Sequence, residues 1–174
     1  MPAQNPASAA AVSANVVEIE HVLSRMTYLA GRARQHERLM ALAGLDLDRA
    51  AVAILRNLAA SDPVRPGVLA VRLTVEASHV TRQLRQLERG GYVVRVADPE
   101  DRRAQRVQLT DAGLAAVERI REVSRRGVAL ALAEWTPEEL EHLAVLFRRL
   151  VHDFLVHTET PLDLPARTSA VSPM

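Results

Sequence analysis

The sequence predicts a mainly α-helical protein with a small β-wing, in which a winged helix-turn-helix DNA-binding module is joined to a helical dimerisation region. Two features of the segment 77–110 predict this fold class. One is an amphipathic helix with a stripe of arginines, and the other is a β-hairpin that follows at once and has an Asp-Arg-Arg tip. A helix that can enter a major groove beside a ribbon with a basic tip is typical of DNA-binding modules.

The arginine stripe follows from the helical step of about 100° per residue. With Ser78 as the origin, Arg82, Arg85 and Arg89 fall within about 40° of it on one face. The apolar residues of this segment fall on the opposite side: Ala77, Val80, Leu84 and Leu87. One face can therefore pack on a core while the other presents guanidinium groups. The glycines at 90–91 provide a signal for the end of the helix.

Three helices are expected before this reading helix. Apolar residues at steps of three and four predict a long first helix from Val16 that can reach Ala43 before Gly44 ends it. Asp46 or Asp48 can cap a second helix, whose apolar face consists of Ala51, Ile54, Leu55 and Leu58. The segment Arg65-Pro66-Gly67 opens a short third helix with apolar residues Val68, Leu69, Val71 and Leu73, which a break at 74–76 separates from the reading helix.

The hairpin and two further helices complete the pattern. Residues 92–96 and 105–109 are expected as strands that flank the loop 97–104. Thr110 or Asp111 can cap a fifth helix with apolar residues Leu114, Val117, Ile120, Val123 and Val128. In the sixth helix, Thr136 is the expected cap, a proline follows in the first turn, and Glu139 completes a capping box.

The domain organisation predicted from these elements has two polar tails around one domain. Residues 1–14 and 158–174 are expected to be a disordered N-terminal tail and a flexible C-terminal tail. The domain spans 15–157, with the DNA-binding module at 45–110 and the helical dimerisation region at 15–44 and 111–157. The apolar faces of that region are too long for the small module alone to cover.

Composition supports an interaction with a polyanion. The net charge is only +1, but the segment 65–106 holds nine arginines and five acidic residues. Positive charge is thus concentrated where phosphate attraction would require it. The chain has no cysteine, no apolar run near the ~20 residues of a membrane span and no signal-peptide pattern at its start, so we expect a cytoplasmic protein without membrane contact.

Several side chains of the module are candidates for contact with DNA. Arg82 and Arg85 can grip guanine O6 and N7 or clamp a phosphate. Ser78, His79 and Thr81 lie in the first turns of the reading helix, the part that usually contacts base edges. At the wing tip, Arg103 suits a narrow minor groove, whereas Arg102 fits a phosphate contact or a surface role equally well. A solvated basic face is the alternative explanation for the stripe, and the wing that follows it favours DNA.

The sequence offers no sign of catalysis, of a metal or of a cofactor. The six histidines form no His-x3-His pair and have no cysteine partner, so a zinc site is not expected. A Ser-His-Asp set could be assembled from Ser78, His79 and Asp98, but no nucleophile elbow or oxyanion hole accompanies it. We therefore expect a protein that is not an enzyme.

The order of these elements resembles the MarR family of bacterial transcription regulators over about residues 16–155. The most specific match is the segment 98–113, which is similar to the family's wing and the helix start beyond it. Supporting matches are 80–82 and 87–91 in and after the reading helix, and 65–70, the opening of the preceding helix, which adds Arg65 to the candidate DNA-binding residues.

The resemblance implies roles that the residues alone do not establish. It implies that Arg103 enters the minor groove, that Asp101 helps to hold it, and that the first and the last two helices build an obligate homodimer. One position departs from the family's pattern. Glu76 stands where many members have serine or another short capping residue, and glutamate is a poor N-cap that would repel phosphate.

The resemblance also suggests a site for an effector. Tyr28, Arg32 and His36 follow one another at four-residue steps on the predicted first helix. In the family this helix borders a cleft that often binds small aromatic acids, so a small aromatic or phenolic effector is possible here. A partly buried helix face is the simpler explanation for any one of the three residues.

The function predicted is a sequence-specific transcription regulator, a ligand-responsive repressor that binds a pseudo-palindromic double-stranded DNA operator as a homodimer. Two alternatives remain open. An architectural DNA-binding protein would use the same arginines as phosphate clamps without regard to sequence. A winged-helix protein-interaction module would dock the arginine stripe on an acidic partner.

Overall fold

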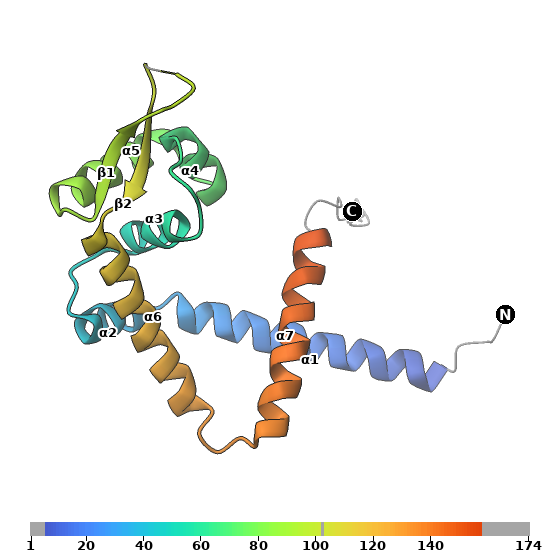
Figure 1. The fold of residues 1–174 in the computed structure, drawn as a ribbon. Coiled ribbons are helices and arrows are strands. Elements are labelled where there is room, and N and C mark those ends of the chain that lie inside the picture. The colour runs from blue at the N-terminus through green and yellow to red at the C-terminus, as the bar shows by residue number, and fades with distance from the viewer. Residues whose placement is uncertain (1–5, 102, 158–174) are drawn as a thin grey trace, which may run out of the picture. The chain divides into compact units, whose positions relative to one another are not determined.

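The computed structural model describes residues 6–101 and 103–157, and its elements confirm the mainly α-helical fold class with a two-stranded wing (Figure 1). In chain order the elements are α1 (Pro6–Ala30), α2 (Ala33–Ala43), α3 (Arg49–Ala59), α4 (Pro66–Leu73), α5 (Ala77–Arg89), β1 (Val93–Ala97), β2 (Gln105–Leu109), α6 (Asp111–Ala131) and α7 (Pro137–His157). The chain divides into two compact units, 1–127 and 128–174, which are described separately.

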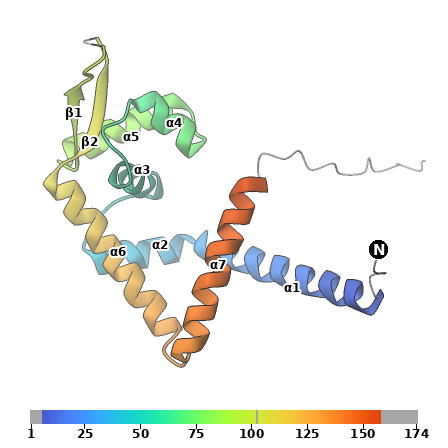
Figure 2. The ribbon, with the colours of Figure 1, turned by 45° about the vertical axis from the view of Figure 1, so that its right-hand side comes forward.

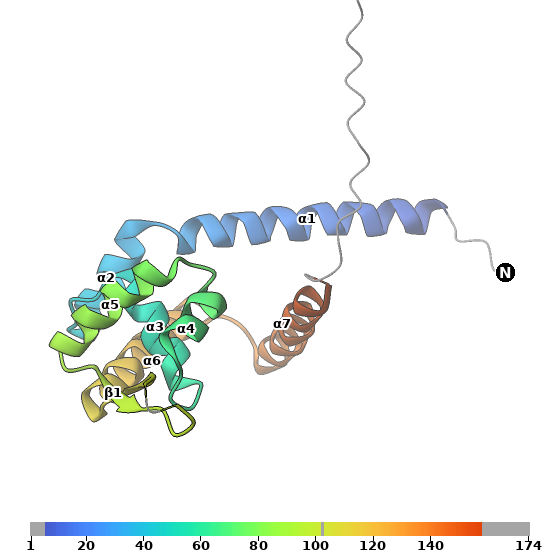
Figure 3. The same ribbon diagram turned by 90° about the horizontal axis from the view of Figure 1, so that it is seen from above.

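The helices α3, α4 and α5 pack together as the helix-turn-helix (Figure 3). Their core contains most of the apolar residues predicted for α3 and α5, with Leu55, Val80, Leu84 and Leu87 each at most 1% exposed. Ala77, expected on the same face of α5, is exposed. In α4 the prediction is only partly correct, because Leu69 is buried whereas Val71 is 80% exposed. An eight-residue helix that crosses its neighbours can bury little more than one edge.

The wing is an antiparallel pair of strands beside this helical cluster (Figure 2). Val93 pairs with Leu109 and Ala97 with Gln105, so the hairpin stays in register over its whole length. Val64 adds an isolated bridge to Val107, with N···O distances of 3.1 and 2.8 Å between their backbones. Because Val64 lies between α3 and α4, this bridge attaches the sheet to the segment that joins these two helices.

A second apolar cluster joins α2 to α3 and α6 within the first unit. Met40, Ala43, Val52 and Ile120 are its buried members. Gly44 ends α2 with φ +62°, a conformation that glycine adopts without a steric cost. α2 thus packs against α3 and α6 in the first unit.

The predicted helix caps form at three sites. Asp48, rather than Asp46, caps α3 and accepts a hydrogen bond from the backbone N–H of Ala51 at 2.7 Å. Thr110 caps α6, and its hydroxyl accepts from the N–H of Gly113 at 3.1 Å. Thr136 and Glu139 form the reciprocal capping box of α7, at 3.3 and 2.8 Å. Each cap satisfies backbone groups that a helix leaves open at its start.

Two predictions for the N-terminal part are wrong. The tail expected over 1–14 is helical from Pro6, because alanine is the strongest helix former and proline suits the first turn. The single helix expected as far as Ala43 is broken at Gly31, after which Arg32 adopts an extended conformation and precedes α2. Residues 1–5 of the predicted N-terminal tail and the predicted C-terminal tail 158–174 lie outside the described residues.

The two longest apolar faces remain exposed in the single chain. On α1 the exposed side chains include Val16, Val17, Ile19, Val22, Met26 and Leu29. In the second unit no residue of α7 is buried, and Leu146, Val151 and Leu155 are more than half exposed. In the part of the chain that the structure describes, no helix is both long and apolar enough to span a membrane.

Candidate nucleic-acid interface

The outward face of α5 carries the predicted reading residues. Ser78, His79, Arg82 and Arg85 are all exposed, while the opposite face of the helix is buried in the core. The hydrophobic pattern of α5 thus orients the arginines by excluding them from the core. Nothing in the described chain covers them, so their guanidinium groups are available for an external partner.

Contacts within α5 distinguish the polar side chains from one another. Arg82 Nη2 lies 3.0 Å from His79 Nε2, so the two side chains form a pair on the exposed face. Thr81 is half-buried, and its hydroxyl donates to the carbonyl of Ala77 at 2.9 Å, which leaves it less prominent than Ser78. Arg89 turns back along the helix and donates to the carbonyl of Arg85 at 3.2 Å.

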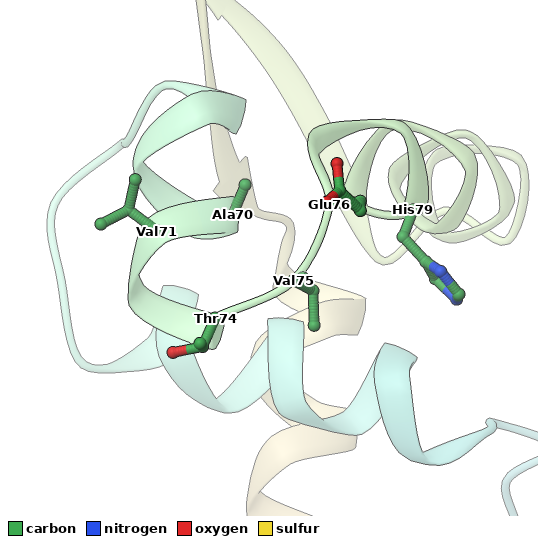
Figure 4. A pocket seen from close by; sticks show the side chains of 6 residues that line it. All are labelled: Ala70, Val71, Thr74, Val75, Glu76 and His79. Carbon is green, nitrogen blue, oxygen red and sulfur yellow. The ribbon is translucent and has the colours of Figure 1, made fainter.

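The turn between α4 and α5 fixes where the reading helix begins. Thr74 ends α4 with φ +53°, a left-handed conformation that is costly for a β-branched residue. The N–H of Val75 donates to the carbonyl of Ala70 at 3.0 Å and so closes the turn. An open hollow lies here, lined by Ala70, Val71, Thr74, Val75, Glu76 and His79 (Figure 4).

Glu76 is the N-cap residue of α5, but its side chain makes no capping hydrogen bond. The N–H of His79, which a capping side chain could have met, donates to the carbonyl of Glu76 at 3.0 Å, and the N–H of Val80 donates to the same carbonyl at 3.3 Å as the first helical bond. The carboxylate is exposed at the start of the helix. The unusual residue at this position therefore leaves a free acceptor beside the reading face.

A buried carboxylate ties the loop end of the wing strands to the residue that precedes α4. Asp98 follows β1, and its side chain is fully buried. Its Oδ2 accepts from Nε of Arg65 at 2.6 Å and from Nε of Arg106 at 2.9 Å, while its Oδ1 accepts from Nη2 of Arg106 at 3.2 Å. The N–H of Glu100 donates to the same Oδ1 at 2.9 Å. One carboxylate thus connects the start of α4, the end of β1 and the strand β2.

These contacts shift the pKa values of all three groups. Hydrogen bonds from Arg65 and then Arg106 hold the pKa of Asp98 well below its usual range, although burial opposes the shift. The hydrogen bond to Asp98 raises the pKa of both guanidinium groups in turn. Glu100 Oε2 also lies 3.5 Å from Nη2 of Arg106, so two cations face two carboxylates in this cluster. The side chain of Arg65, 45% exposed, is a structural anchor that can still present N–H groups outward.

The wing tip is organised by the predicted aspartate. Asp101 Oδ1 accepts from the backbone N–H of Arg103 at 3.0 Å, and the carbonyl of Asp101 accepts from the N–H of Ala104 at 2.9 Å. Asp101 therefore shapes the backbone of the turn rather than pairing with the guanidinium group. The side chain of Arg103 is exposed. The predicted contact residue Arg102 lies outside the described residues.

Two further links position α5 and involve residues that the sequence did not single out. Gln83 is buried and donates from Nε2 to Oδ2 of Asp48, the cap of α3, at 2.8 Å. At the far end of α5, Glu88 pairs with Arg95 of β1 at 3.2 Å. The partners are 35 and 7 residues apart, so no helical or strand spacing could have indicated either link.

The predicted effector residues do not form the continuous stripe that the sequence suggested. Tyr28 belongs to α1 and His36 to α2, and the break at Gly31 separates them. Arg32 does lie over the Tyr28 ring, with Cζ 5.8 Å from its centroid, whereas His36 Nε2 lies 2.7 Å from the carbonyl oxygen of Leu47. Among the described residues, no group of three or more potential metal ligands is gathered.

Comparison with known proteins identifies the module. The model of the MarR family matches residues 47–104, the segment that runs from the start of α3 through β1 to the loop of the wing. This segment, a third of the chain, is similar to the MarR family.

Bacterial transcription regulators are also similar to this chain. It is 31% identical over 97 residues to the HTH-type transcriptional regulator YkoM of Bacillus subtilis, covering 56% of this chain and 63% of YkoM. It is also 31% identical over 99 residues to the HTH-type transcriptional regulator PecS of Dickeya dadantii, covering 57% and 60%. The matches thus span about three fifths of the length of these relatives, which are named as regulators and not as enzymes.

Solved structures share the fold of this chain. A MarR family protein from Bacillus stearothermophilus has a TM-score of 0.70 at 24% identity, with 82% of this chain and 97% of that chain covered. A crystal structure of MarR has a TM-score of 0.61 at 26% identity, with 79% and 98% covered. The arrangement of α3–α5 and the wing is therefore that of known winged-helix proteins.

Proposed function

We propose that this chain is a sequence-specific DNA-binding transcription regulator, a repressor that binds a pseudo-palindromic operator as a homodimer. The proposal rests on one observation: the packed module exposes arginines in two places, on α5 and at the tip of the wing. Arg82 and Arg85 project from α5, whose opposite face is in the core, and Arg103 lies at the tip of the attached wing. Binding to DNA would use both places, because α5 can enter the major groove while the wing arginine enters the adjacent minor groove.

Relatives provide further support. Those that match the chain at 31% identity are named as HTH-type transcriptional regulators. A MepR variant of S. aureus with the same fold, at a TM-score of 0.55 and 22% identity, has been solved bound to an oligodeoxyribonucleotide. Contact with double-stranded DNA through α5 and the wing is consistent with both.

The homodimer follows from the apolar faces that the single chain leaves exposed. α1 presents valine, isoleucine, leucine and methionine side chains, and α7 has no buried residue. Such surfaces in one chain indicate a partner, and a second copy is the simplest one. A two-fold axis then places two copies of α5 in successive major grooves, roughly 10 bp apart or a multiple of this distance.

Selection of bound DNA from a random library by the purified protein tests the proposal. We expect an enriched inverted repeat, a dimer in light scattering, and competition by random DNA that is at least about 10³-fold weaker. Equal affinity for all sequences would favour an architectural DNA-binding protein. If binding to random DNA shows no dependence on salt, a protein-interaction module is favoured instead. A promoter that contains the selected site should be less active when the protein is present.

The same proposal includes regulation by a small aromatic acid near the N-terminal helices. Arg32 can pair with a carboxylate, and the Tyr28 ring that it covers can stack on an aromatic group. The ligand must favour a dimer whose reading helices are wrongly spaced, because it shifts an equilibrium only by its differential affinity. Salicylate-like acids should release the operator from the protein but not from Arg32→Ala. Equal release from both proteins would contradict the role of Arg32.

A further inference from the structure

We infer that Glu76 is a specificity-determining residue that selects cytosine in each half-site of the operator. This inference rests on the proposed function and deepens it, because it assigns a base to one side chain of the reading helix. A carboxylate beside a polyanion is unfavourable unless it finds a hydrogen-bond donor. The position of Glu76 and its lack of partners among the described residues restrict what that donor can be.

The backbone of Glu76 is held on both sides. Before it, the N–H of Val75 is tied to Ala70, and Thr74 ends α4 in the left-handed conformation. After it, the Glu76 carbonyl accepts from the N–H groups of His79 and Val80 at 3.0 and 3.3 Å. The start of α5 is therefore a rigid point from which the side chain projects. In helix-turn-helix proteins the N-terminal residues of this helix contact base edges.

The carboxylate of Glu76 is exposed and has no partner among the described residues. It makes no capping hydrogen bond, and none of the ion pairs within the described ranges includes it. Arg82, on the same helix, pairs with His79 instead. Beside Glu76, the hollow in Figure 4 is lined mainly by the small and apolar side chains of Ala70, Val71 and Val75. Glu76 can thus meet an external donor without breaking an internal contact.

Cytosine is the base whose chemistry fits this acceptor. An ionised carboxylate only accepts hydrogen bonds, and it repels phosphates and the carbonyl oxygens of guanine and thymine. The major-groove edge of cytosine offers the N4 amino group without an adjacent ring acceptor, whereas adenine places its N7 acceptor beside its amino group. Loss of the charge should therefore strengthen binding to DNA in general and weaken the choice of cytosine.

The test compares the full-length protein with Glu76→Gln and with a matched control. Glu37→Gln removes the same charge from α2, where the carboxylate is exposed and also has no hydrogen bond or ion pair with a described residue. Sites are selected from a random library by each protein, and the affinities for the wild-type site and its single-base variants are then measured at one salt concentration. Thermal unfolding of each protein establishes that the substitutions leave the fold intact.

We expect the wild type and Glu37→Gln to prefer cytosine at one position of each half-site by about ten-fold. In Glu76→Gln this preference should largely disappear, while binding to random DNA becomes tighter. Replacing the cytosine with 2-pyrimidinone, which lacks the N4 amine, should weaken the wild type by a similar factor. It should leave the affinity of Glu76→Gln almost unchanged.

Other outcomes separate this inference from the proposed function. A cytosine preference that survives Glu76→Gln unchanged would overturn the inference and leave the operator proposal standing. If Glu76→Gln loses a preference for adenine rather than one for cytosine, the inference is also overturned. If the wild type shows no sequence preference at all, the operator proposal fails and the inference fails with it.

Discussion

Replacing Gly113 with alanine would put a methyl group against the backbone that joins α5 to the wing. A Cβ built on Gly113 lies 2.1 Å from the carbonyl oxygen of Tyr92 and 3.1 Å from Cδ2 of Leu109. The shortest ordinary contact between a carbon and an oxygen is about 3.3 Å, so α6 and the strand must separate by more than about 1 Å. The oxygen cannot rotate away like a side chain, because it belongs to the backbone and accepts from the N–H of Thr110 at 3.1 Å.

The magnitude follows from two opposing effects. Overpacking of this kind costs about 1–3 kcal/mol, and the backbone clash at Gly113 puts it at the upper end of that range. Replacing a glycine within a helix by alanine stabilises the helix by up to about 1 kcal/mol. We therefore expect Gly113→Ala to lower the free energy of unfolding by about 2 kcal/mol. In a chain of this size that corresponds to a fall in Tm of about 4–8 °C.

Urea unfolding followed by circular dichroism measures this change, with Gly67→Ala as the control. Gly67 lies within α4 and has no atom within 4 Å of a built Cβ, so alanine there should leave stability unchanged or raise it by up to about 1 kcal/mol. Equal stability of Gly113→Ala and the wild type would refute the close approach of α6 to Tyr92. A loss of stability in Gly67→Ala would refute the reasoning on which the control depends.

Four further outcomes are expected. Arg103→Ala should weaken operator binding substantially and leave the free energy of unfolding within about 0.5 kcal/mol of the wild-type value, because the side chain is exposed. Unchanged affinity in a titration at moderate salt would exclude a role of the wing tip in binding. If the guanidinium of Arg82 grips a base, Arg82→Ala should lower the binding free energy by about 1–3 kcal/mol and relax the preference at one operator position. An equal loss of affinity for all sequences, with the dependence of log affinity on log salt flatter by about one unit, would indicate a phosphate contact instead. The folded-state pKa of Asp98 lies below its unfolded value, so its contribution to stability is complete above about pH 4 and is lost as the pH falls through the folded pKa. In urea unfolding between pH 7 and 3, the free energy of unfolding should therefore fall more steeply with acid in the wild type than in Asp98→Asn. The same dependence on pH in both proteins would contradict the pairing of Asp98 with the arginines. Deletion of residues 136–174 should give monomeric or insoluble protein that binds DNA poorly, while deletion of 160–174 should not, and light scattering of both proteins decides between these outcomes.

The winged-helix module is the part of this protein that local sequence patterns predicted well. The faces of α3 and α5 and the strands of the wing follow from spacings of a few residues, because one turn of helix or one strand pair sets which side chains share a face. The capping box of Thr136 and Glu139 is similarly local. These features need only neighbouring residues, so they are visible before the chain is folded.

Breaks in helices were harder to predict, even though they are also local. The chain bends at Gly31 and places Arg32 in an extended conformation, although the apolar spacing continues beyond it. Conversely, residues 6–14 are helical despite a composition that is typical of a tail. In both cases competing preferences differ by about 1 kcal/mol or less per residue, which composition alone cannot decide.

The sequence by itself determined which face of α5 is apolar, which is basic, and that a hairpin with an arginine at its tip follows, because periodicity and turn chemistry act over a few residues. Only the tertiary structure decided which groups secure that hairpin and that helix. Asp98 meets Arg65 across 33 residues and Gln83 meets Asp48 across 35, and the glycine requirement at 113 comes from a carbonyl oxygen 21 positions earlier, at Tyr92. Such pairs become neighbours when the core of α3, α4 and α5 packs, and no pattern along the chain encodes which of many arginines a buried carboxylate will accept.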